Sequence, residues 1–130
     1  GIRPVFEATF SIEDKLYKDW FLFDTGNTSN GVIGNGFLGI NNLYDKFSNV
    51  LGVGRNKIAF IPKLNIANQT FTEGVIALEK PNKNGSEYKF AGLIGNKILK
   101  HFNVIIDNRE GFIYLKPSLF WNKKDYSKKQ

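Results

Sequence analysis

Short apolar runs, broken by polar and glycine-rich turns, make up most of the chain, and this pattern is typical of strands rather than long helices. The first two runs are joined by a turn at Glu13-Asp14-Lys15, and the second run ends at the acid Asp24. Such frequent punctuation predicts an all-β domain. Strands are expected over residues 4–10, 17–23, 61–66, 71–78, 90–95, 104–106 and 111–115.

One stretch has a clear helical pattern. Asn96 can cap a short helix that carries Ile98, Leu99 and Phe102 on one face. The Gly- and Asn-rich segment 27–42 predicts loop, with a short helical turn inside it.

The length and charge of the chain fit one domain with a polar end. A chain of 130 residues, 42% hydrophobic and with 12 Phe, is large enough for one core. Residues 1–117 are expected to form this domain, and 118–130 a basic polar tail. Residues 116–130 hold five Lys and one acid, so they carry +4 of the net charge of +6; a solvated tail is therefore favoured and no nucleic-acid partner is expected. No apolar run reaches the length of a membrane span.

The residue types that are missing narrow the possible chemistry. The chain has no Cys and only one His, His101. Thiolate nucleophiles, disulfides and two-His metal sites are therefore excluded within this chain, and neither a metal nor a cofactor is expected. Carboxylates are the remaining candidates for catalysis.

Asp24 is the strongest of these candidates, because the apolar run Phe21-Leu22-Phe23 delivers it to a sharp turn at Thr25-Gly26. A carboxylate at the mouth of a buried strand is paired, hydrogen-bonded or used in chemistry. Two such carboxylates that share one proton can activate water and polarise a carbonyl group. This chain has one Asp-Thr-Gly, so the second acid must come from another lobe. Asp24 as a turn residue bonded to backbone amides is the alternative.

The sequence resembles the retroviral-type and pepsin-like aspartic proteases, and more closely a group of bacterial aspartyl-protease-like proteins. The resemblance rests on Phe21–Gly26 and on Ala91-Gly92-Leu93-Ile94-Gly95-Asn96-Lys97-Ile98-Leu99, followed by residues 102–107 and 113–115. It spans roughly residues 5–117. It implies a single retropepsin-like lobe: a closed or nearly closed barrel with one short helix after the strand Leu93-Ile94-Gly95.

The resemblance also implies roles for single residues. Asp24 would be the catalytic carboxylate, Thr25 would bond across to a partner lobe, and the Gly26 amide would approach the carboxylate. Asn27 departs from the Ala, Ser or Thr that is common there, so its amide would either bond the outer carboxylate oxygen or crowd it. Leu93, Ile94 and Gly95 would back the acid loop, and residues 50–60, with Gly52, Val53, Gly54 and Arg55 at their centre, resemble a flap over substrate.

The resulting hypothesis is an aspartic peptidase lobe that hydrolyses peptide bonds only when paired with a second Asp-Thr-Gly. The partner is either a second copy of the chain or another lobe of a longer two-lobed protein. The second arrangement is favoured because the resembled bacterial proteins are often two-lobed, and their location suggests the cell envelope. A non-catalytic module that holds an extended peptide in the same cleft is the alternative.

Overall fold

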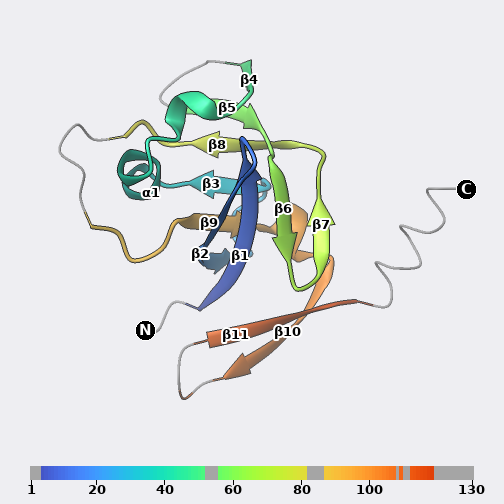
Figure 1. Ribbon diagram of the computed structural model, residues 1–130. Helices are drawn as coiled ribbons and strands as arrows, with labels where there is room; N and C mark the ends of the chain where they lie inside the picture. The colour runs from blue at the N-terminus through green and yellow to red at the C-terminus, as the bar shows by residue number, and fades with distance from the viewer. Residues whose placement is uncertain (1–3, 52–55, 82–86, 108, 110–111, 119–130) are drawn as a thin grey trace, which may run out of the picture.

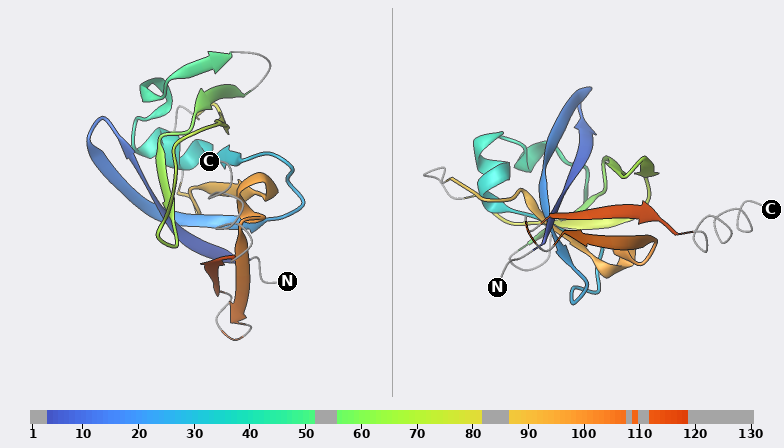
Figure 2. Two further views of the ribbon diagram at one scale, coloured as in Figure 1. Left: turned by 90° about the vertical axis from the view of Figure 1, so that its right-hand side faces the viewer. Right: turned by 90° about the horizontal axis from the view of Figure 1, so that it is seen from below.

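The computed structural model describes residues 4–51, 56–81, 87–107, 109 and 112–118 of the chain. An 11-stranded sheet runs in the order β10-β11-β1-β2-β9-β3-β8-β5-β4, with β6 pairing to β1 and β7 to β6. The sheet curls into a half-barrel, and the β10–β11 hairpin projects from its lower end (Figures 1 and 2). The strands are β1 Val5–Ile12, β2 Lys15–Asp24, β3 Gly31–Ile33, β4 Asn49–Leu51, β5 Lys57–Phe60, β6 Lys63–Ile66, β7 Gln69–Phe71, β8 Val75–Leu78, β9 Gly92–Gly95, β10 Phe102–Asp107 and β11 Phe112–Pro117.

The predicted all-β class and the short helix after Gly95 are confirmed. This helix, α2 Asn96–Leu99, is shorter than the apolar pattern predicted, because Phe102 already begins β10. Phe102 is nonetheless buried. A second helix, α1 Asn35–Ile40, lies where a helical turn was expected, and a 3-10 turn, η1 Tyr44–Lys46, follows it.

Two strand predictions were wrong in detail. The segment 27–42 was predicted as loop, yet its residues 31–33 form β3 between β9 and β8. The strand predicted over 71–78 is two strands, β7 and β8, which belong to different parts of the sheet. Gly74 separates them with a φ of 101°, a backbone conformation that L side chains rarely adopt and that ends a regular strand.

Two tight turns set the register of the β1–β2 and β6–β7 hairpins. Glu13 and Asp14 join β1 to β2 with φ values of 50° and 65°. Ala67 and Asn68 join β6 to β7 with φ values of 48° and 67°. Two consecutive positive φ values are typical of the two-residue hairpin turns whose twist matches that of the strands.

The core is aromatic at its centre. Phe10 is 1% exposed, and its ring lies 5.5 Å from that of Phe37 and 5.7 Å from that of Tyr17, between centroids. The Phe21 ring meets it edge-on at 6.3 Å. These contacts join α1 to the β1–β2 hairpin, so the strand that carries Asp24 is anchored in the core at Phe21.

Several predictions lie partly outside the described residues. The candidate flap residues Gly52, Val53, Gly54 and Arg55 lie outside the described residues. The strands β4 and β5 on either side of them pair as an antiparallel ladder. The tail beyond residue 118 also lies outside the described residues.

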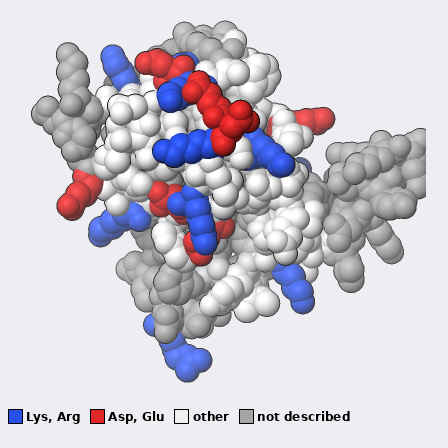
Figure 3. Space-filling model, viewed as in Figure 1, with Lys and Arg blue, Asp and Glu red and all other residues white. Residues whose placement is uncertain are grey.

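In the described part of the chain, no helix is both long and apolar enough to span a membrane. On the face in Figure 3, the coloured Lys and Arg side chains alternate with Asp and Glu.

Candidate active site

Asp24 ends β2, where that strand lies beside β9. The two strands pair in parallel, with Leu22 opposite Leu93 and Asp24 opposite Gly95. The two sequence segments that carry the family resemblance are therefore neighbours in the sheet. Gly95 is also the residue from which α2 begins, so the acid, the backing strand and the helix meet at one point.

The strand register also decides which face of the sheet Asp24 occupies. Residues paired across a ladder point to the same face, and residues two apart on a strand share a face. Asp24 thus lies on the same face of the sheet as Leu22. Phe21 and Phe23 lie on the opposite face, and Phe21 is fully buried in the core. Pairing continues the Leu22 face across four further strands through a row of apolar side chains: Leu93, Val32, Ala77 and Ile58.

We call the row Leu22, Leu93, Val32, Ala77 and Ile58 the apolar band. All its members except Leu22 are half-buried. One pair further along, Phe60 and Val75 are 53% and 38% exposed. The face that carries Asp24 therefore offers apolar surface that is incompletely covered in the described chain.

The carboxylate of Asp24 is half-buried and held by its own turn. The Gly26 amide donates a hydrogen bond to Asp24 Oδ1 at 3.2 Å, and the Asn27 amide donates to the Asp24 carbonyl at 3.2 Å. Thr25 and Gly26 are exposed. This arrangement leaves the carboxylate at the surface with one oxygen fixed by a backbone donor.

Asn27 takes neither of the directions considered from the sequence. Its side-chain Oδ1 accepts hydrogen bonds from the Ser29 amide at 2.9 Å and from Ser29 Oγ at 2.5 Å. Ser29 Oγ in turn accepts from the Gly31 amide at 3.1 Å. The amide that was expected to bond or crowd Asp24 is thus used to shape the loop that follows it.

The same loop is fastened to the start of α2, beside which it lies in the left panel of Figure 2. The Asn96 amide donates to the Asn27 carbonyl at 2.7 Å, and the Gly95 amide to the Asn30 carbonyl at 2.9 Å. A Cβ at Gly95 would lie 2.2 Å from the Ser29 carbonyl oxygen. Gly95 backs the loop because only a residue without a side chain fits there.

Asn30 is a site residue that sequence reasoning missed. Its side chain is 9% exposed, and its Nδ2 donates to the Val75 carbonyl at 2.8 Å, which ties the acid loop to β8. The run Asn27-Thr28-Ser29-Asn30 carried a signal, since these residue types bond to nearby backbone. Nothing in the sequence identifies β8 as the partner.

The structure brings together Asp24, Gly26, Asn27 and Gly95. Two clefts among the described residues are lined by other parts of the chain. Within the described ranges, no three His, Asp or Glu side chains group as metal ligands.

Comparisons with known proteins give matches among solved structures alone. No protein-family model and no curated protein matches the chain. The retroviral protease-like domain of Ddi1 from Leishmania major matches at 13% identity and a TM-score of 0.48, covering 89% of this chain and 95% of that one. A retropepsin-like aspartic protease from Rickettsia conorii matches at 18% identity and a TM-score of 0.48, covering 82% of each chain. Both are similar in fold to the lobe predicted from the sequence.

Proposed function

We propose that the chain is one lobe of an aspartic peptidase, in which Asp24 acts with an Asp of a second lobe to hydrolyse peptide bonds. The observation that carries the proposal is the position of Asp24: it ends a core strand, on the face of the sheet that bears the apolar band. A peptide laid along that face would meet apolar surface beside the carboxylate. The expected substrates are therefore extended peptides with apolar side chains next to the cleaved bond.

The chemistry follows from two carboxylates in contact. Like charges held close together cannot both ionise easily, so one acid keeps its proton while the other is a carboxylate. The carboxylate takes a proton from water as the water attacks the peptide carbonyl, and the protonated acid donates to the carbonyl oxygen. The Gly26 amide on Asp24 Oδ1 supports this role because it fixes the carboxylate orientation.

The partner that supplies the second acid is part of the proposal. We infer a second Asp-Thr-Gly lobe, on another segment of the same protein or on a second copy of this chain. Thr25, exposed at the tip of the turn, is the residue proposed to bond across to that lobe. The segment 52–55 is proposed as the centre of a flap that limits water access.

Substitution of Asp24 tests the proposal. The paired protein should cleave a mixture of apolar-rich peptides at mildly acidic pH, and activity should fall on both sides of the optimum because one acid must be protonated and the other ionised. Asp24→Asn should reduce cleavage by about a thousandfold or more, since general acid–base catalysis needs the carboxylate. Asp14→Asn is the matched control, because Asp14 lies in an exposed turn at a positive φ that Asn tolerates.

Two outcomes would reject the proposal. Cleavage that persists in Asp24→Asn would remove Asp24 as the essential acid. A paired protein that cleaves none of the peptides, and binds them equally well before and after the Asp24→Asn substitution, would instead be a binding module.

A mixing experiment identifies the partner. If a second copy supplies the acid, excess Asp24→Asn chain should inhibit the unsubstituted chain, whereas a partner lobe on the same protein predicts no inhibition.

A further inference from the structure

A cleft lies between β1 and β11, on a part of the lobe that does not include Asp24. β1 and β11 pair in parallel at one position, Val5 opposite Phe112, and then diverge. The turn of the β6–β7 hairpin points into the angle between them (Figure 1). The resulting cleft has a volume of about 480 Å³. Its lining residues are Phe6, Glu7, Trp20, Ile66, Ala67, Ile113, Tyr114 and Leu115.

Two aromatic side chains and one carboxylate give this cleft its chemical character. Tyr114 is 60% exposed and Trp20 is 36% exposed. Glu7 is the acid among the lining residues, and it lies opposite Trp20 in the β1–β2 ladder. Aromatic faces attract cations, and a carboxylate attracts them more strongly. A cleft that combines these three groups with apolar side chains is complementary to a long side chain that ends in a positive charge.

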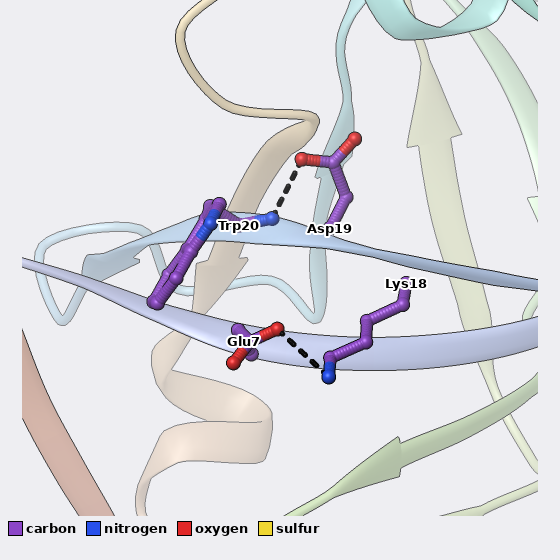
Figure 4. Close-up of polar contacts among 4 residues, drawn as sticks. All are labelled: Glu7, Lys18, Asp19 and Trp20. Atoms are coloured by element: carbon purple, nitrogen blue, oxygen red, sulfur yellow. Dashed lines mark hydrogen bonds and ion pairs between the residues drawn. The ribbon is translucent and has the colours of Figure 1, made fainter.

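The structure itself contains a cation near this carboxylate. Lys18 Nζ lies 3.3 Å from Glu7 Oε2, and both side chains are largely exposed, at 64% and 43%. Figure 4 shows Lys18, Glu7 and the Trp20 ring on one side of the hairpin, with Asp19 turned the other way. An exposed pair of this kind is weak, so an incoming cation can compete with Lys18 for Glu7.

The backbone beside the cleft is suited to an extended chain. β11 pairs with β10 through its whole length, from Phe112 to Pro117. Its other edge, among the pairings of the described residues, joins β1 only at Phe112. Residues 113–117 thus offer a strand edge along the wall of the cleft, and such edges accept an added strand.

We propose that the cleft between β1 and β11 binds an extended peptide segment by strand addition to β11, with a Lys or Arg side chain of that segment held by Glu7, Trp20 and Tyr114. This site is separate from the proposed catalytic site. It does not depend on Asp24 or on the second lobe. A protein that has both sites would hold a basic segment of its substrate away from the bond that is cleaved.

The probes are two peptides labelled with fluorescein at the N-terminus, fluorescein-Gly-Val-Thr-Arg-Val-Thr-Val-NH2 and its citrulline counterpart, which differ in the charge of one side chain. Binding is measured by fluorescence anisotropy with Asp24→Asn protein, so that cleavage plays no part. The Arg peptide should bind at least about fivefold more tightly than the citrulline peptide, as expected for one exposed cation contact. Glu7→Gln should abolish this preference, and Lys18→Met should increase it by freeing Glu7.

Glu13→Gln is the matched control, because Glu13 also forms an exposed ion pair, with Lys46 at 3.5 Å. It changes the net charge as Glu7→Gln does and should leave the preference intact. Trp20→Phe, which keeps a smaller aromatic ring, should weaken binding of both peptides. Amide NMR shifts on adding the Arg peptide should appear at Ala67 and at Tyr114–Leu115.

Three results would overturn the proposal. The first is equal binding of the Arg and citrulline peptides. The second is an Arg preference that survives in Glu7→Gln, which would show that Glu7 is not its source, or one that is lost equally in Glu13→Gln, which would assign it to net charge. The third is self-association of the peptide-free protein: its sedimentation coefficient would rise with concentration, and that of Trp20→Phe would not. The cleft would then be occupied by a second copy of the chain. None of these results depends on cleavage, so they are distinguishable from failure of the proposed peptidase.

Discussion

At the scale of single residues, the acid loop depends most directly on Gly95. It pairs with Asp24 across the sheet, donates its amide to the Asn30 carbonyl, and begins α2. A Cβ added there would lie 2.6 Å from Asn27 Oδ1 in addition to its clash with the Ser29 carbonyl. Both obstacles belong to a loop that is tied at several points, so neither can move alone.

Gly95→Ala should therefore lower the free energy of unfolding by about 1–3 kcal/mol, the usual cost of overpacking. Urea unfolding followed by tryptophan fluorescence measures the change. Gly26→Ala is the matched control: its added Cβ would be 3.4 Å from Asp24 Oδ1, an ordinary contact. It should change stability by no more than about 0.5 kcal/mol. Equal costs for the two substitutions would contradict the backing role of Gly95.

The residues around Asp24 show which features of the acid loop could be predicted from the sequence and which could not. The apolar run before Asp24 and the glycine after it predicted a strand end and a turn, because these depend on local backbone preferences. The direction of the Asn27 side chain could not be predicted, because its Oδ1 accepts hydrogen bonds from the amide and hydroxyl of Ser29, and these depend on the shape of the folded loop. The bond from Asn30 to Val75 joins residues 45 positions apart and needs the folded sheet.

At the scale of elements, prediction worked for the long strands β1 and β2 and failed for the short strand β3. β1 and β2 contain eight and ten residues, enough for the apolar pattern to be clear. β3 contains three residues and follows a polar loop, so its strand character comes from β9 and β8 on either side. The parallel pairing of β2 with β9 is a tertiary feature that periodicity does not give; the family resemblance implied only that residues 93–95 back the acid loop.

The start of β5 is held by a lysine that the sequence did not single out. Lys57 Nζ donates to the Tyr44 carbonyl at 3.1 Å and lies 4.8 Å from the centroid of the Tyr44 ring. Its side chain is 14% exposed, and Asp45 Oδ1 lies 4.0 Å away. β5 is thereby attached to the turn η1.

Lys57→Met should destabilise the protein by about 1–2 kcal/mol, because it keeps the apolar stem but leaves the Tyr44 carbonyl without its donor. Thermal unfolding measures the change. Lys46→Met is the control, since Lys46 forms an exposed ion pair and should cost less than about 0.5 kcal/mol. If both substitutions cost the same small amount, Lys57 is a surface charge and does not hold η1.

At the scale of the whole molecule, Tyr88 ties together three parts of the chain. Its hydroxyl donates to Asp19 Oδ2 of β2 at 2.7 Å, across 69 positions of sequence. Its ring meets that of Phe37 edge-on at 5.9 Å. A Cβ at Gly36 of α1 would lie 2.7 Å from the Tyr88 Cβ, so the helix packs closely on this residue. The segment that leads into β9 is thus fixed to α1 and to the strand that carries Asp24.

This contact predicts a specific alkaline instability. Burial, together with the hydrogen bond to Asp19 and the charge of that acid, raises the pKa of Tyr88 from 10.0 to about 12. The folded state therefore favours the neutral phenol. The stability contributed in this way is complete below pH 10 and is lost as the pH rises from 10 towards 12.

Urea unfolding of the unsubstituted protein and of Tyr88→Phe, from about pH 8 to about pH 11.5, measures this contribution. At the lower pH the unsubstituted protein should be more stable than Tyr88→Phe, because Phe leaves Asp19 without this donor. This difference in the free energy of unfolding should shrink once the pH passes 10.0, the ordinary pKa of the phenol. Other groups titrate in this range, but they are common to both proteins and cancel in the difference. A difference that stays constant over the whole range would show that Tyr88 is not held in its neutral form by the fold.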